Sequence, residues 1–297
     1  MSAVTSLDRF FLTVIVAALV VANAACLVRT ENPPPVPLAT RTAGLEELLS
    51  KLDSLDAIES LRSRVHLQLS VLTQDRQKIK AYPESDGFVL IRRPSSIRVR
   101  AEFPVVGSTV FDITSDGTTF SVHLPTKNRY LVGLNELSKP SKKREENVRP
   151  QHILEALMVD ARREDEEFAV LENASYGPLA YHVVVFVRKT DFGYRLSRKI
   201  WFDRVDLDVA RQQIYDLHGD VVTDAWYREW APGEPIRYPT VVEINRPTNG
   251  YVLTVRFLRL RLNVDVPEEG FLLKPPEGVK IEEIGQLDEE EDSEKNP

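Results

Sequence analysis

Hydrophobic residues that alternate with polar ones, in short runs separated by turn residues, are the feature that most constrains the fold of this chain. In residues 64–72, Val65, Leu67, Leu69 and Val71 are apolar and the residues between them are polar. Such alternation places every second side chain on one face of a β-strand. Similar runs follow at residues 87–92, 97–103, 109–114, 119–124 and 129–132. Short strands spaced this closely predict an antiparallel meander.

The second half of the chain continues this pattern. Further strands are predicted at residues 168–173, 181–189, 194–203, 212–217, 221–229, 240–245 and 251–263, and a change of phase at Phe257-Leu258 predicts a bulge in the last of them. Apolar residues at helical spacing predict two helices instead, at residues 43–62 and 150–159. Strands and helices do not alternate as they do in a parallel sheet. The chain is therefore predicted to be mainly β (α+β), with about eleven or twelve strands.

The N-terminal segment predicts export. Phe10 to Val21 form an apolar run that suits the core of a signal peptide but is short for a membrane-spanning helix. Cys26, the only cysteine of the chain, follows it closely. This placement favours a lipoprotein in which residues 1–25 are a signal peptide and Cys26 carries the lipid. Two alternatives stay open, namely an ordinary secretory signal cut after Ala24 and an uncleaved N-terminal anchor.

Two polar segments flank the predicted domain, which covers residues 43–281. Residues 26–42 contain a Pro-rich stretch and are predicted to be a tether. Residues 282–297 contain eight acidic residues and one lysine, a net charge of −7 that equals the formal charge of the whole chain. This acidic tail is predicted to be disordered. Because the rest of the chain has no net charge, the sequence argues against nucleic-acid binding.

The sequence contains no recognised catalytic, phosphate-binding or metal-binding motif. The five histidines are scattered, so we expect no catalytic residue, no metal and no cofactor, and the chain is not predicted to be an enzyme. Several strands are instead apolar on both faces, as in residues 183–187 and 200–202. Because an antiparallel sheet usually has one solvated face, this excess favours a cavity for apolar ligands. The alternative is a sheet that helices bury on both sides without a cavity.

A set of turn and strand motifs lies between residues 87 and 133. It consists of Arg93-Pro94, Ile97-Arg98-Val99, Phe111-Asp112-Ile113, Ser115-Asp116-Gly117, Leu124-Pro125 and Asn128, and Tyr238-Pro239, Ile244-Asn245-Arg246-Pro247, Asn263 and residues 271–276 extend it. These motifs resemble those of the LolA/LolB lipoprotein-carrier superfamily over most of residues 43–280. The resemblance implies an unclosed, strongly curved antiparallel β-barrel of about eleven strands, with helices covering the concave face above a hydrophobic cavity.

With Cys26, this resemblance predicts an anchored receptor of the LolB type that faces the periplasm from the outer membrane. The partners it implies are acyl chains of lipoproteins or lipids, the membrane through the lipidated N-terminus, and a periplasmic carrier protein. The alternative is a structural or stress-sensing interaction module of the cell envelope with a filled core. The expected cavity residues are Leu48, Leu52, Val65, Leu67, Leu69, Val99, Phe111, Ile113, Phe120 and Val122.

Overall fold

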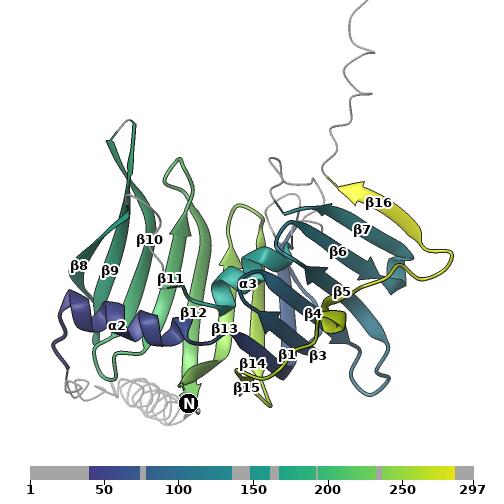
Figure 1. Cartoon of the computed structure of the whole chain (residues 1–297), viewed down its shortest axis with the longest axis horizontal. Coiled ribbons are helices and arrows are strands. Elements are labelled where there is room, and N and C mark those ends of the chain that lie inside the picture. The colour runs from purple at the N-terminus through teal and green to yellow at the C-terminus, as the bar shows by residue number, and fades with distance from the viewer. Residues whose placement is uncertain are drawn as a thin grey trace, which may run out of the picture. The chain divides into compact units, whose positions relative to one another are not determined.

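One continuous β-sheet makes up most of this chain in the computed structural model (Figure 1). The structure describes residues 40–73, 78–135, 148–160, 167–191, 193–231 and 236–284. All of them belong to one compact unit, Ala39–Pro297. The predicted signal peptide, Cys26, nearly all of the tether and most of the acidic tail lie outside the described residues, so what the sequence indicates for them stays a prediction.

Within the described ranges, the sheet has sixteen strands and is open, because each of its two end strands pairs with one neighbour only. Its order is β16-β7-β6-β5-β4-β3-β1-β14-β13-β12-β11-β10-β9-β8, and β2 and β15 also pair with β1. The pairs are antiparallel except for β16 and β7, which are parallel. The bounds are β1 Ser60–Leu72, β2 Ile79–Ala81, β3 Ser85–Arg92, β4 Ser96–Glu102, β5 Thr109–Ser115, β6 Thr119–Leu124, β7 Arg129–Leu134, β8 Glu167–Tyr176, β9 Leu179–Thr190, β10 Gly193–Asp203, β11 Val209–Tyr215, β12 Val221–Ala231, β13 Tyr238–Arg246, β14 Tyr251–Phe257, β15 Arg261–Leu262 and β16 Lys280–Ile284. The predictions of a mainly β chain and of an unclosed antiparallel sheet are confirmed.

The predicted strand count was too low, because β2 and β16 carry no clear alternation in the sequence and because one predicted strand is divided in two. The run at 251–263, predicted as one bent strand, is two strands in the structure. β14 ends where Phe257 pairs with Val65, and β15 resumes where Arg261 pairs with Arg62. Three residues, 258–260, therefore lie opposite two, 63 and 64. One extra residue on one strand is what a β-bulge inserts, and it lies at the predicted place.

The sheet also continues past residue 281, where the acidic tail was predicted to begin. Glu282 and Glu283 lie in β16, and Glu282 pairs with Arg129 of β7, whose Nε lies 3.0 Å from both carboxylate oxygens. The hydrogen bonds from Arg129 and Lys280 lower the pKa of Glu282 to about 2. The described part of the chain therefore ends at Ile284 as a strand at the edge of the sheet.

Helix α2 (Leu45–Asp56) ends earlier than the predicted helix at 43–62. Its stripe of leucines is buried as expected, with Leu48 and Leu52 fully covered. The helix stops because the chain from Ser60 onward pairs with β3. The side chain of Asn263 holds the connection, since it donates to the carbonyl of Ala57 at 2.9 Å and accepts from the amide of Glu59 at 2.8 Å.

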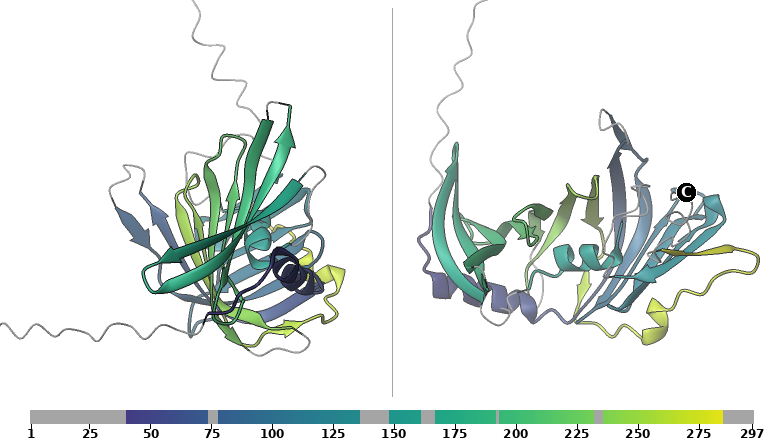
Figure 2. Two further views of the ribbon diagram at one scale, coloured as in Figure 1. Left: turned by 90° about the vertical axis from the view of Figure 1, so that its left-hand side faces the viewer. Right: turned by 90° about the horizontal axis from the view of Figure 1, so that it is seen from above.

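Helix α3 (Pro150–Leu157) begins with proline at its first position, where the missing amide hydrogen costs nothing. It contacts β4 and β5 on one side and β12 and β13 on the other. Three strands stand between β4 and β13 in the sheet, a separation of about 19 Å at ~4.8 Å for each strand step. One helix contacts both because the sheet bends around it (Figure 2). Tyr227 and Tyr238 fix the helix end, donating from Oη to the carbonyls of Ala156 (2.8 Å) and Leu157 (2.6 Å).

The main hydrophobic core lies between these helices and one face of the sheet. Strand β1 shows the rule, because Leu61 and Val65 are buried in the core whereas Arg62 and Arg64 are exposed on the other face. On that other face, residues 264–273 form a crossing segment that is hydrogen-bonded to side chains of β3, β4, β5 and β7 and includes the short 3-10 helix η3 (Glu268–Phe271). Among the described residues, no helix is long and apolar enough to span a membrane.

Candidate functional site

The ten residues predicted to line a ligand cavity come together in the structure, but in a packed core. Eight of them are buried in the main hydrophobic cluster, and Leu69 and Phe111 pack against it while partly exposed. Phe120 shows how tight this packing is, since a Cβ added at Gly133 would approach its ring to 2.9 Å. Leu48 and Leu52 reach the same cluster from α2. Whether any of the ten contacts a ligand stays a prediction.

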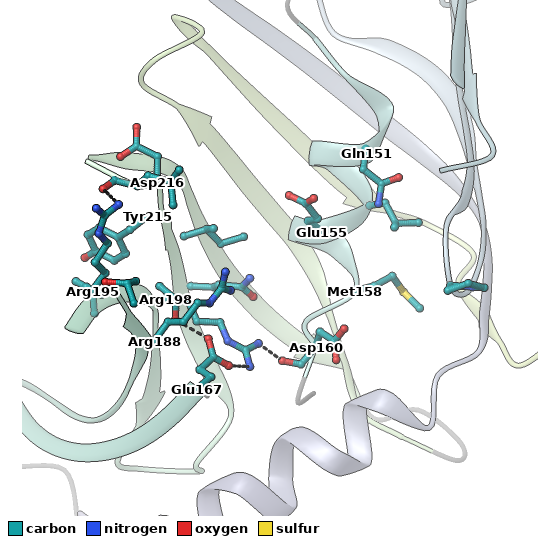
Figure 3. A pocket seen from close by; sticks show the side chains of 18 of the residues that line it. Gln151, Glu155, Met158, Asp160, Glu167, Arg188, Arg195, Arg198, Tyr215 and Asp216 are labelled. Atoms are coloured by element: carbon teal, nitrogen blue, oxygen red, sulfur yellow. Dashed lines mark hydrogen bonds and ion pairs between the residues drawn. The ribbon is translucent and has the colours of Figure 1, made fainter. Parts of the chain in front are cut away.

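A cavity of about 700 Å³ lies instead beside α3, on the side of β9, β10 and β11. None of the ten predicted residues lines it. Its apolar lining includes Leu154 and Met158 at α3, Leu196 on β10, Ile214 on β11 and Leu217 in the next turn. Figure 3 shows Glu155 projecting from the helix on one side of the space, and Arg188, Arg195, Arg198 and Tyr215 on the strands on the other side.

The charged lining of the cavity is balanced between four arginines and four acids. The arginines are Arg93, Arg188, Arg195 and Arg198, and the acids are Glu155, Asp160, Glu167 and Asp216. Most of these charges are held in place by protein contacts. Arg198 lies 3.3 Å from the Glu167 carboxylate and stacks 4.0 Å above the Phe186 ring, and Arg195 donates to the carbonyl of Leu217 at 2.6 Å.

Arg93 joins the cavity to both helices. Its Nε donates to the carbonyl of Ile58 at 2.9 Å, and its Nη2 donates to the carbonyl of Val159 at 3.3 Å. The same guanidinium pairs with Asp56 at the end of α2 at 3.2 Å and with Asp160 just after α3 at 3.9 Å. Arg93-Pro94 is one of the motifs that carry the superfamily resemblance. In this chain the arginine fixes the ends of the two helices.

Glu155 faces the cavity above a buried arginine. Its side chain is accessible to solvent in the cavity, yet protein surrounds it on most sides, and this burial raises its pKa despite the attraction of Arg246. Arg246 itself is buried and donates to neutral acceptors, Oδ1 of Asn249 at 3.1 Å and Nε2 of His152 at 3.2 Å. Burial, helped by Arg246 and Arg149, lowers the pKa of His152 to about 3, so this imidazole is neutral near pH 7.

Three buried polar atoms in or near α3 have no hydrogen-bond partner among the described residues: Gln151 Oε1, His152 Nδ1 and Tyr251 Oη. Such atoms are rare in folded proteins and usually have a water or a ligand as partner. Within the residues that the structure describes, no group of three histidine, cysteine or acidic side chains is placed to hold a metal ion. Of these three residues, Gln151 lines the cavity, whose side chains offer both apolar and polar contacts.

Sequence reasoning missed this cavity because charged residues line it. No role was predicted for Arg188 and Arg198 from the sequence, whereas in the structure both are partly buried around the cavity. The partners that keep Arg198 there, Glu167 and the carbonyl of Asp160, are more than 30 residues away in the sequence. The strongest signal in the sequence for a cavity at this place was the apolar content on both faces of β9 and β10.

Comparison with known proteins gives no family model and no curated protein that matches this chain. Similar solved structures do exist. A LolA superfamily protein from Nitrosomonas europaea shares 14% identity, with a TM-score of 0.48 over 78% of this chain and 99% of that chain. A DUF1329 family protein from Desulfovibrio piger shares 13% identity, with a TM-score of 0.48 over 76% and 94% of the two chains. An outer membrane lipoprotein-sorting protein domain from Vibrio parahaemolyticus shares 9% identity, with a TM-score of 0.47 over 77% and 97%. The first of these solved structures bears the name of the superfamily that the sequence motifs of this chain resemble.

Proposed function

We propose that this chain is a lipid-anchored envelope protein that binds acyl-bearing, amphiphilic ligands in the cavity beside α3. In this proposal it acts as a carrier or receptor for lipids or lipoproteins at the outer membrane, facing the periplasm. Acyl chains are its ligands, and a periplasmic carrier protein is its partner. Helices α2 and α3 cover the concave face of the sheet, and α3 forms one wall of the site.

The observation that carries the proposal is the mixed lining of this cavity. Its volume of about 700 Å³ lies within the range of ~300–1,000 Å³ that is usual for small-molecule sites. Leu196, Ile214 and Met158 offer apolar contact to a chain, which is worth about 0.8 kcal/mol for each methylene that is buried. Arg195 and Glu155 offer charges of both signs to a polar head. A ligand without a polar head would leave these charged side chains without a contact.

The proposed ligand site therefore differs from the one predicted by strand alternation. The predicted residues on β1, β4, β5 and β6 pack against one another, whereas the cavity lies on the side of β9, β10 and β11. The bend of the sheet around α3 divides these two regions. We propose that the helix separates a filled half of the concave face from a half that takes the ligand.

The filled core favours a second candidate function, a structural or stress-sensing interaction module. A further observation supports it. Among the described strands, β8 is at one end of the sheet and pairs with β9 alone, while its Phe168, Val170 and Tyr176 side chains are more than half exposed. An unpaired strand edge with exposed apolar side chains is suited to pairing with a strand of another protein. In this alternative, protein contacts carry the function and the cavity binds no lipid.

Acyl binding can be tested with a pair of cavity substitutions. Leu196→Gln together with Ile214→Gln removes apolar contact from the part of the lining that β10 and β11 supply, and we expect affinity for a fluorescent fatty-acid probe to fall at least tenfold. The control is Leu134→Gln with Ile281→Gln, the same chemical changes at exposed positions on β7 and β16, which should change affinity less than twofold. The wild type should bind at micromolar concentrations. If it binds no acyl probe and carries no lipid by native mass spectrometry, the interaction module becomes the better explanation.

The anchor can be tested separately at Cys26, the only cysteine in the chain. Because lipid would be attached through its thiol, Cys26→Ser should abolish labelling by radioactive palmitate and release the protein from membranes. Membrane fractionation of both variants in the producing cells measures this. A wild type that takes up no label and stays in the membrane fraction regardless of Cys26 would favour the uncleaved anchor instead.

A further inference from the structure

A second concave surface lies on the face of the sheet opposite to the helices. This groove of about 550 Å³ is lined by Arg62 and Arg64 of β1, by Arg259 and Arg261 in the segment that leads through β15, and by apolar residues of β3 and of the crossing segment. We call it the arginine groove. Leu61 and Val65 point from β1 into the core, so the arginines between them point the other way. The groove is therefore distinct from the cavity beside α3.

Three of the four arginines of the arginine groove have no counter-charge among the residues that the structure describes. Arg62 and Arg261 are directly opposite one another in the antiparallel pair of β1 and β15, an arrangement that is destabilising for like charges. All four arginines are exposed, and no acidic side chain lines the groove. Glu102 lies 3.8 Å from Arg64 at its border, while Arg62, Arg259 and Arg261 have no ion pair within the described ranges.

Apolar side chains lie directly beside these charges. Phe88 and Leu90 of β3 are half-buried in the lining, and Val266 and Pro267 close it from the crossing segment. A guanidinium group offers a planar fork of donors that matches the oxygens of a phosphate in two parallel hydrogen bonds. Several forks next to an apolar strip fit a molecule in which a phosphate is joined to a hydrocarbon. A free inorganic ion would leave the apolar strip unused.

We propose that the arginine groove binds the phosphate head group of an anionic lipid. Arg62 and Arg261 contact the phosphate, whose negative charge removes the repulsion between them. Phe88 and Leu90 contact the first part of the hydrocarbon. The proposal does not depend on ligand binding in the cavity beside α3, because the two sites are on opposite faces of the sheet.

The test is calorimetric titration of the full chain in neutral maltoside detergent with three probes: dihexanoyl phosphatidic acid, dihexanoyl phosphatidylcholine and inorganic phosphate. We expect the anionic lipid to bind at least tenfold more tightly than either of the other two. Arg62→Gln with Arg261→Gln should weaken its binding at least tenfold. The control is Arg228→Gln with Arg256→Gln, which removes two exposed arginines that each contact a carboxylate, at 3.2 and 3.0 Å, and should change binding less than twofold.

Two controls in the same experiment test whether the arginine variant folds and whether the cavity beside α3 takes part in the binding. Because Arg62→Gln with Arg261→Gln removes a repulsion, its melting temperature should equal or exceed that of the wild type. Leu196→Gln with Ile214→Gln should leave this binding unchanged, so failure of the cavity proposal would be seen separately. Equal binding of the two lipids, or equal binding by wild type and the Arg62/Arg261 variant, overturns the proposal. Binding that appears only after residues 287–297 are removed also overturns it, because the acidic tail would then be the occupant.

Discussion

Leu48→Asp together with Leu52→Asp is expected to leave the chain unfolded at room temperature. Both side chains have no exposed surface and contact the main core from α2. Their removal from the core costs about 1.5–3 kcal/mol for each leucine, before any charge is considered. Two carboxylates without partners in that core add several kcal/mol more. The sum approaches the entire net stability of a typical domain, about 5–15 kcal/mol.

The matched control places the same two charges on the other side of the same helix. Ser50 and Ser54 are exposed, so Ser50→Asp with Ser54→Asp should lower the melting temperature by only a few degrees. Circular dichroism during heating measures both variants. A melting temperature of the Leu48/Leu52 variant within a degree or two of wild type would contradict the packing of α2 against the sheet.

These leucines also illustrate what the sequence can predict. Burial of a stripe at helical spacing follows from local periodicity, and so does the alternation that buries Val65 and exposes Arg64. The strand positions in both halves of the chain were predictable for the same reason. The place of the bulge after Phe257 was predictable as well, because a change of phase is itself a local signal.

Features that depend on distant partners were not predictable from local patterns. β16 belongs to the sheet because Lys280–Ile284 pairs with β7, about 150 residues earlier, and its acidic residues alone indicated a disordered tail. The early end of α2 at Asp56 has the same explanation. The apolar residues continue at helical spacing to Ile58, but the pairing of Ser60 with Arg92 begins a strand instead. Alternation indicates which side chains face inward, but it does not indicate whether they pack against one another in a core or line a cavity.

The motifs that carry the superfamily resemblance have structural roles in this chain. Asp116 accepts hydrogen bonds from the amides of Thr118 and Thr119, both at 2.8 Å, and thereby closes the turn between β5 and β6. These hydrogen bonds lower the pKa of Asp116 even though partial burial opposes them. Arg93 fixes the ends of both helices, as described above. Such motifs predict how the sheet is built, whereas the proposed apolar contacts to the ligand come from residues outside them, such as Leu196 and Ile214.

Arg98 and Asp112 form the motif pair with the largest expected effect on stability. The guanidinium donates to both carboxylate oxygens, from Nε at 2.9 Å and from Nη2 at 2.8 Å, and both side chains are largely buried. The hydrogen bond to Asp112 is the main reason that the pKa of Arg98 is raised. From Nη1, Arg98 also donates to the carbonyl of Gly270 at 2.9 Å and so holds the crossing segment against β4. The pair thus joins β4, β5 and residues 264–273.

Asp112→Ala is therefore expected to lower the free energy of unfolding by about 3–5 kcal/mol, because it leaves a buried guanidinium without its counter-charge. Adding Arg98→Met should recover part of this loss, since no unpaired charge then remains. Glu243→Ala is the control: its partner Arg228 is exposed, the two atoms are 3.2 Å apart, and the expected loss is about 0–1 kcal/mol. Urea denaturation followed by tryptophan fluorescence measures all three. Equal losses for Asp112→Ala and Glu243→Ala would mean that solvent reaches Arg98, and that the crossing segment contributes little to the stability of the sheet.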